Sequence, residues 1–188
     1  MKRKPILKVM MSLCFATLGS CVSPTGPEKI AASSAQRPDN SLAGQVLQEV
    51  NSYRRSHGAA DLQMHPGLNG LAQKHCEYLV QNRGKFGIYG KNVSHFGSEG
   101  RALVARERYK MTSYCENVAA AVHPGKVAAP TLVKLWSSSK DHEFNMRSAW
   151  THTGIGVVVA DDGMVFSTEI FATMSNSQLA TRQRLSGF

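Results

Sequence analysis

The cysteine with the clearest chemical context lies near the N-terminus, at Cys21. It follows a basic head and an apolar run from Val9 to Leu18, which is too short to cross a bilayer as a helix because a span needs about 20 apolar residues. Gly19 and Ser20 are the small residues expected before a cleavage site. This arrangement predicts a removable signal over residues 1–20 and a Cys21 thiol that carries a diacylglycerol. An ordinary signal peptide with an incidental cysteine is the alternative.

Processing at Cys21 would leave one domain long enough for a hydrophobic core. The signal contains four basic residues and no acidic ones, so the formal net charge would fall from +9 to about +5. A mildly basic protein favours anionic surfaces such as phospholipid headgroups or cell-wall polymers. Lys and Arg are spread along the chain without an aromatic-rich basic cluster, so we expect no nucleic-acid partner.

Two cysteines, Cys76 and Cys115, remain once Cys14 leaves with the signal and Cys21 is acylated. An even pair of cysteines in an exported protein predicts a disulfide. Two separate buried thiols are the alternative.

Histidines and carboxylates that could support metal or acid–base chemistry lie in short motifs. The motifs are Ser94-His95, Cys115-Glu116-Asn117-Val118-Ala119, and Trp136-x-x-Ser139-x-x-His142 followed by Asn145-Met146. Together with an opening Asn51-Ser52-Tyr53-Arg54 and a closing pair of strands, they resemble the motifs of the CAP family in the family's order. CAP covers cysteine-rich secretory proteins, antigen 5 and the plant pathogenesis-related 1 proteins. The resemblance covers about residues 42–173 and is greatest to the bacterial secreted branch.

The resemblance implies a central cleft in which two histidines and two acidic residues can hold a divalent metal. The matching residues are His95, Glu116 and His142. The second acid has no counterpart, because Asp141 and Glu143 do not lie at the matching position. We therefore expect these three side chains to converge in one cleft, although a complete set of four metal ligands is not evident.

Two imidazoles and a carboxylate suit zinc or another divalent first-row metal, and three protein ligands leave a coordination position for water. Without a metal, a His–Glu pair can orient a water molecule as a general base. Alternatively, Glu116 bonds backbone amides in a loop and the histidines are satisfied polar residues.

Glu169 alternates with Ser167 and Phe171 on one face of an expected strand. It could face the cleft or form a salt bridge at the rim. The remaining five histidines have no partner indicated by spacing, and we interpret them as surface or helix-end residues: His57, His65, His75, His123 and His152.

Helices in the first part of the chain and strands in the last part must position these groups. Capping and apolar spacing predict helices from Ser41 to Gly58, after Pro66, from about Ser98 to Tyr109, and from near Pro130. A strand is expected over Glu116–Val122, and two β-branched runs around Asp161-Asp162-Gly163 predict a hairpin. This pattern indicates an α+β fold, and the resemblance implies a three-layer α-β-α sandwich with a mostly antiparallel central sheet.

The expected organisation is a signal (1–20), a flexible tether (21–40), a CAP-like domain (41–175) and a polar C-terminal tail (176–188). We expect a monomer that is exported and anchored in the bacterial cell envelope through Cys21, in the outer membrane or facing the periplasm. Two functions remain open. The first is a binding module for a metal or a polar, lipid or cell-wall glycan ligand. The second is a hydrolase in which His95, Glu116 and His142 act on a peptide or glycan.

Overall fold

The structure is a computed structural model that describes residues 41–87 and 92–175. The predicted signal, Cys21, the tether and the C-terminal tail lie outside the described residues. Within the described part of the chain, no helix is both long and apolar enough to cross a membrane.

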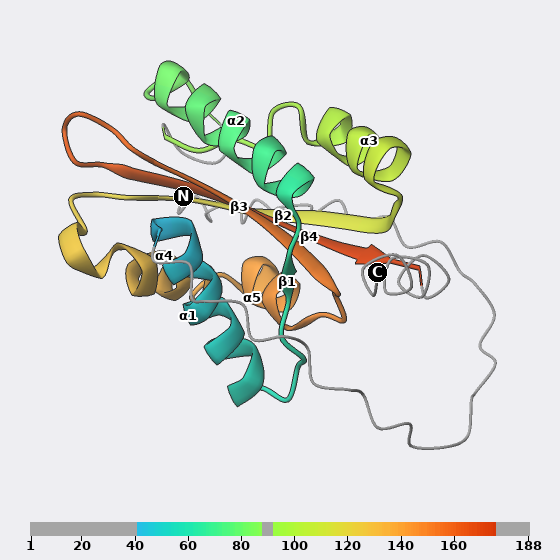
Figure 1. The fold of residues 1–188 in the computed structure, drawn as a ribbon. Helices are drawn as coiled ribbons and strands as arrows, with labels where there is room; N and C mark the ends of the chain where they lie inside the picture. The colour runs from blue at the N-terminus through green and yellow to red at the C-terminus, as the bar shows by residue number, and fades with distance from the viewer. Residues whose placement is uncertain (1–40, 88–91, 176–188) are drawn as a thin grey trace, which may run out of the picture.

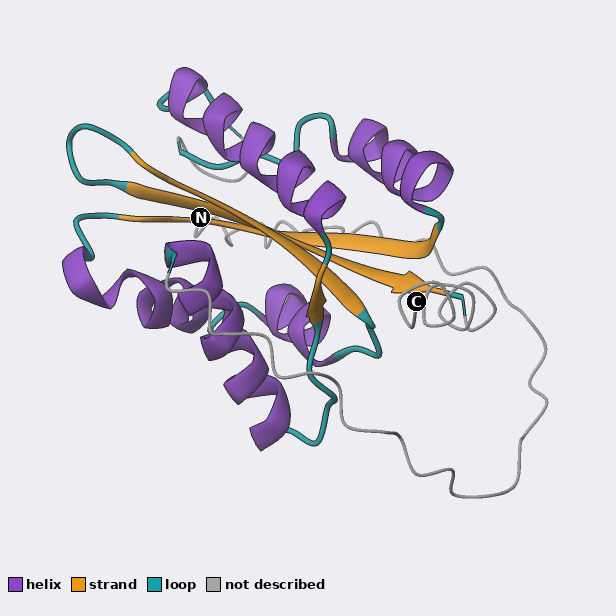
Figure 2. Cartoon of the chain, viewed as in Figure 1, coloured by secondary structure: helices purple, strands orange, loops and turns teal. Residues whose placement is uncertain are grey.

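A four-stranded sheet forms the middle layer, with the strand order β1-β3-β4-β2 (Figures 1 and 2). Its strands are β1 (Gln63–Met64), β2 (Met111–Ala121), β3 (His152–Val159) and β4 (Val165–Met174). The short β1 pairs with β3 in parallel, whereas the β3–β4 and β4–β2 pairs are antiparallel. The sheet is therefore mostly antiparallel, as expected, and β2 forms one of its edges.

Helices cover both faces of the sheet, which confirms the predicted three-layer fold (Figure 1). One layer holds α2 (Pro66–Asn82) and α3 (Ser98–Tyr109). Helix α2 begins with Pro66 in its first turn and packs directly on β3. Gly154 and Gly156 permit this close packing, because a Cβ atom at Gly154 would lie 2.2 Å from the backbone of Leu68.

The opposite layer contains α1 (Leu42–Ser56), α4 (Ala128–Ser137) and α5 (Lys140–Arg147) (Figure 1). The hydroxyl of Ser41 accepts a hydrogen bond from the Gly44 amide at 3.1 Å and caps α1, as the sequence predicts. Trp136 of α4 and Val50 of α1 pack with Phe171 of β4 in the main hydrophobic core. A short 3₁₀ helix, Gly125–Val127, precedes α4.

The predicted Cys76–Cys115 disulfide is wrong, because neither of these buried cysteines is in a disulfide. Cys76 lies on α2, where its thiol donates a hydrogen bond to the Gly156 carbonyl at 3.2 Å. Cys115 lies on β2 and belongs to the core between the sheet and α1/α4. The two side chains lie on opposite faces of the sheet, so no bond can join them without rearranging the layers.

Candidate functional site

The candidate site is built around the carboxylate of Glu116, which is 6% exposed on the edge strand β2. Arg101 donates two hydrogen bonds to it, from Nε to Oε2 at 2.9 Å and from Nη2 to Oε1 at 2.7 Å. His95 Nδ1 lies 2.8 Å from Oε1, and the Tyr114 hydroxyl donates to Oε2. Both carboxylate oxygens are thus held by charged or polar partners.

Two left-handed residues at the ends of α3 bring these partners together. Gly97, with φ of +76°, precedes α3 and places His95 just outside the helix. Lys110, with φ of +60°, ends α3 and turns the chain directly into β2 at Met111. Helix α3 therefore lies against β2, and Arg101 in its first turns reaches Glu116.

Hydrogen bonding keeps Glu116 ionised inside the protein. Burial alone raises the pKa of this carboxyl, but the hydrogen bonds from His95 and Arg101 and the charges of these groups outweigh burial. The pKa falls from 4.5 to about 2. Glu116 is consequently a fixed negative charge at physiological pH.

His142 reaches the same region from α5, in the opposite helical layer. Its ring centroid lies 6.5 Å from that of His95. The Asn117 side-chain amide donates to the His142 carbonyl at 3.0 Å and accepts from the Asn145 amide at 2.9 Å. Asn117 therefore ties α5 to the edge strand and fixes the position of His142.

The His142 ring is neutral at physiological pH. Burial lowers its pKa, the charge of His95 lowers it further, and Asp141 opposes them, with a final value of about 4. The site thus combines an ionised carboxylate–guanidinium pair with a neutral imidazole that can exchange hydrogen bonds with a polar ligand.

A family model for the cysteine-rich secretory protein family, CAP, matches residues 47–174. The chain belongs to the CAP family. This membership confirms the resemblance inferred from the motifs, and the matched region contains His95, Glu116 and His142.

Solved structures share the CAP fold at low sequence identity. An outer surface protein from Borrelia burgdorferi has a TM-score of 0.58 at 14% identity, over 72% of this chain and 95% of that one. A cysteine-rich secretory protein from Staphylococcus aureus has a TM-score of 0.51 at 17% identity, over 76% of this chain and 43% of that one. An extracellular protein with an SCP domain from Bacillus anthracis has a TM-score of 0.51 at 24% identity, over 75% and 45% of the two chains. No curated protein shows a significant sequence match.

His75 is a neighbour of this CAP site that the sequence analysis missed. The residue is 3% exposed in the middle of α2, so the interpretation as a surface or helix-end residue is wrong. The same holds for His152, which is 3% exposed and begins β3. The Nδ1 atom of His75 lies 3.0 Å from the Thr168 hydroxyl. Burial lowers the pKa of His75 to about 4, with Arg101 contributing in the same direction. Its place in the middle of an amphipathic helix is the sequence signal for this burial.

Glu169 does not join the other predicted site residues in this CAP domain. It pairs with Asn117 across the β4–β2 ladder, so the two side chains share a face, whereas Glu116 pairs with Ile170 and lies on the other face. Glu169 is fully buried, and its Oε1 atom lies 3.1 Å from the Thr153 hydroxyl. Burial raises the pKa of this carboxyl to about 8.

The contacts of Glu116 do not fit the divalent metal ion that the sequence predicts at this site. Both oxygens of Glu116 already contact Arg101, whose guanidinium occupies the place of a cation. Across the described residues, no group of three or more His, Cys, Asp or Glu side chains could hold a metal ion. Zinc binding by His95, Glu116 and His142 remains a prediction that this geometry does not favour.

Arg101 and Asn117 were absent from the predicted set of site residues. Asn117 lies in the Cys115-Glu116-Asn117 motif, and Asn145 follows His142 in the second motif. Their hydrogen bond explains why these two segments bring the site together. Arg101 had no comparable signal, because a basic residue in an early turn of a polar helix is ordinarily solvated.

Proposed function

We propose that this protein is an exported, lipid-anchored binding module of the cell envelope. A polar cell-wall glycan is the proposed ligand, in contact with His95 and His142 at the edge of β2. Membership in a family of secretory proteins supports export, as does the likeness to an outer surface protein and an extracellular SCP-domain protein. The basic head, the short apolar run and Cys21 support the lipid anchor.

The observation that carries the binding role is the fully engaged carboxylate of Glu116. A general base works best when its pKa is near the operating pH. The pKa values of Glu116, about 2, and His142, about 4, make both groups weak bases at neutral pH. Glu116 instead fixes Arg101 and His95 in place, which is a preorganising role suited to ligand recognition.

A hydrolase is the second candidate, and one contact favours it. The 2.8 Å contact between His95 Nδ1 and Glu116 is the geometry by which a carboxylate orients an imidazole. In this alternative, His95 would accept a proton from water and Glu116 would hold the ring. Peptide or glycan bonds would be the targets.

Binding to purified peptidoglycan sacculi tests the proposal. We expect His95→Ala and His142→Ala to weaken binding by about tenfold, in the range of one well-placed interface contact. His123→Ala is the matched control, because His123 is exposed on the loop after β2 and should bind normally. Equal binding by all four proteins would contradict the proposed site.

Release of soluble fragments from the same sacculi separates the two candidates. The binding module should release none, whether it carries Glu116 or Glu116→Gln. Release by the wild type that disappears in Glu116→Gln would favour the hydrolase instead. The mass of the N-terminal peptide tests the anchor separately, since the proposal requires a diacylglycerol on Cys21.

A further inference from the structure

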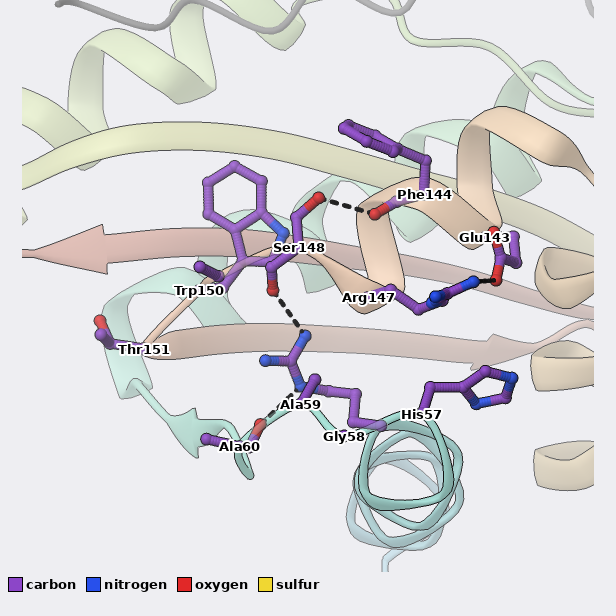
Figure 3. Close-up of a pocket in the computed structure, with 12 residues that line it drawn as sticks. His57, Gly58, Ala59, Ala60, Glu143, Phe144, Arg147, Ser148, Trp150 and Thr151 are labelled. Atoms are coloured by element: carbon purple, nitrogen blue, oxygen red, sulfur yellow. Dashed lines mark hydrogen bonds and ion pairs between the residues drawn. The ribbon is translucent and has the colours of Figure 1, made fainter.

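A pocket of about 690 Å³ lies on the layer of α1 and α5 and contains none of His95, Glu116 or His142. The end of α1, the loop after it, the end of α5 and the segment leading into β3 form its walls (Figure 3). Figure 3 shows that His57 comes to this pocket from one segment, and Arg147 and Trp150 from a second segment far from it in the sequence.

Arg54 is the buried residue of the pocket lining, with only 1% of its surface exposed. Its Nε donates to the Ala60 carbonyl at 2.7 Å, and its Nη1 donates to the carbonyls of Met146 and Ser148. Nη2 has no hydrogen-bond partner among the described residues, yet it is not one of the enclosed polar atoms without a partner. Nη2 therefore keeps a small exposed area and two unused N–H donors, on a residue that lines the pocket.

The charge of Arg54 is not balanced by a direct ion pair within the described part of the chain. Asp61, the nearby exposed carboxylate, is bound by Arg55 at 2.8 Å. Burial raises the pKa of Glu169 to about 8, so this neighbour is mostly neutral at pH 7. A buried guanidinium without a counter-ion favours an anionic ligand.

The remaining lining favours a ligand with one negative charge and provides an apolar surface. Arg147 and Glu143 pair at 3.0 Å and add no net charge to the pocket, so Arg54 supplies its one uncompensated positive charge. The Trp150 indole is held in place by its hydrogen bond to the Asn145 carbonyl at 2.8 Å. Its ring, with Ala59 and Ala149, gives the pocket an apolar wall.

We propose that this pocket binds a small organic monocarboxylate. The carboxylate accepts hydrogen bonds from Arg54 Nη2, and the apolar body of the ligand packs beside Trp150. This site is independent of the proposed glycan site, because the two share no residue.

Indole ¹H–¹⁵N NMR of the folded protein, titrated with benzoate, provides the test. The protein has two tryptophans, and Trp136 is fully buried away from the pocket lining, so it is an internal control. We expect a saturable shift of the Trp150 signal and no shift of the Trp136 signal. Benzamide, which has the same shape without the charge, should bind at least about tenfold more weakly. Inorganic phosphate should also be weaker than benzoate.

Substitution at the exposed Ala149 tests the charge requirement without removing the buried Arg54. Ala149→Glu adds a negative charge to the pocket lining, and Ala149→Gln adds the same bulk without it. We expect Ala149→Glu to bind benzoate about fivefold or more weakly than Ala149→Gln, because like charges repel. Equal affinities of these variants would overturn the proposal. So would equal affinities for benzoate and benzamide, tighter binding of phosphate, or parallel shifts of both tryptophans.

Discussion

Glu116 and Glu169 are two buried glutamates of one sheet. They differ in the face of the sheet on which they lie, in their hydrogen-bond partners and in their pKa values. Glu116 faces α2 and α3 and receives charged donors from Arg101. Glu169 faces α1 and α5, with Oε1 near Thr153 and with Oε2 enclosed and unpartnered among the described residues. Their pKa values, about 2 and about 8, lie on opposite sides of the ordinary value of 4.5.

Hydrogen bonding supports a protonated Glu169. The Thr153 hydroxyl has one hydrogen but lies 3.1 Å from Glu169 Oε1 and 2.9 Å from the Ile170 carbonyl. If Glu169 is protonated, its O–H can donate to Thr153, and Thr153 can donate to Ile170. The comparison shows that burial alone does not set the charge of a carboxyl group. The supply of donors makes Glu116 a charged site residue and leaves Glu169 a neutral core residue.

Removing Glu116 should produce the largest effect. Glu116→Ala leaves the Arg101 guanidinium, whose side chain is 12% exposed, without its counter-ion. We expect a loss of about 3–5 kcal/mol in the free energy of unfolding, the range for breaking a buried pair. Urea denaturation at pH 7 measures it. Glu143→Ala, which breaks the more exposed pair with Arg147, is the control and should change little. Similar losses in both variants would contradict the idea that the buried Glu116–Arg101 pair contributes more stability than the exposed pair.

Glu169→Gln should change the pH dependence of stability, with an intermediate effect. The folded-state pKa of Glu169 is raised from 4.5 to about 8, so this carboxyl stabilises the fold fully below pH 4.5. The contribution is lost as the pH rises through 8. From pH 5 to pH 9, we expect the wild type to lose roughly 2–4 kcal/mol relative to Glu169→Gln.

Denaturation of both proteins at the two pH values measures this difference. Glu116 predicts the opposite trend, because its lowered pKa contributes stability that is present above pH 4.5 and lost as the pH falls through about 2. If the free energies of unfolding of wild type and Glu169→Gln differ by the same amount at pH 5 and pH 9, the pKa of Glu169 is not raised in the folded protein.

Local signals in the sequence predict most of the scaffold. Ser41 as a cap, Pro66 in a first turn and Asp162-Gly163 as a turn each favour one local structure, and each is found. Helix α5 and the two-residue β1 were not predicted, because both are short and tertiary contacts stabilise them. Asn117, for example, holds α5 through the His142 carbonyl.

The side of the sheet on which each buried group lies could be predicted only in part. Strand β4 is buried on both faces, so its apolar pattern does not show which way Glu169 points. Strand β2 has a usable constraint, because Cys115 and Glu116 are neighbours and must point to opposite faces. Once Glu116 faces α3 in the layer of α2, Cys115 must face away from Cys76. The error in the disulfide prediction came from counting cysteines without this alternation.

Reduction should have the smallest effect, because the two faces of the sheet separate the thiols. A Cys76–Cys115 bridge would close a loop of about 40 residues and contribute roughly 3–4 kcal/mol, and reducing it would lower the melting temperature by several degrees. Without this bridge, we expect melting temperatures with and without reductant to agree within about 1 °C. Burial raises the pKa of the Cys76 thiol to about 12, so alkylation should be slow in the folded protein. Peptide masses after alkylation in urea without reductant should show both cysteines modified. Two unmodified cysteines would instead indicate a disulfide, which requires both side chains to lie on the same face of the sheet.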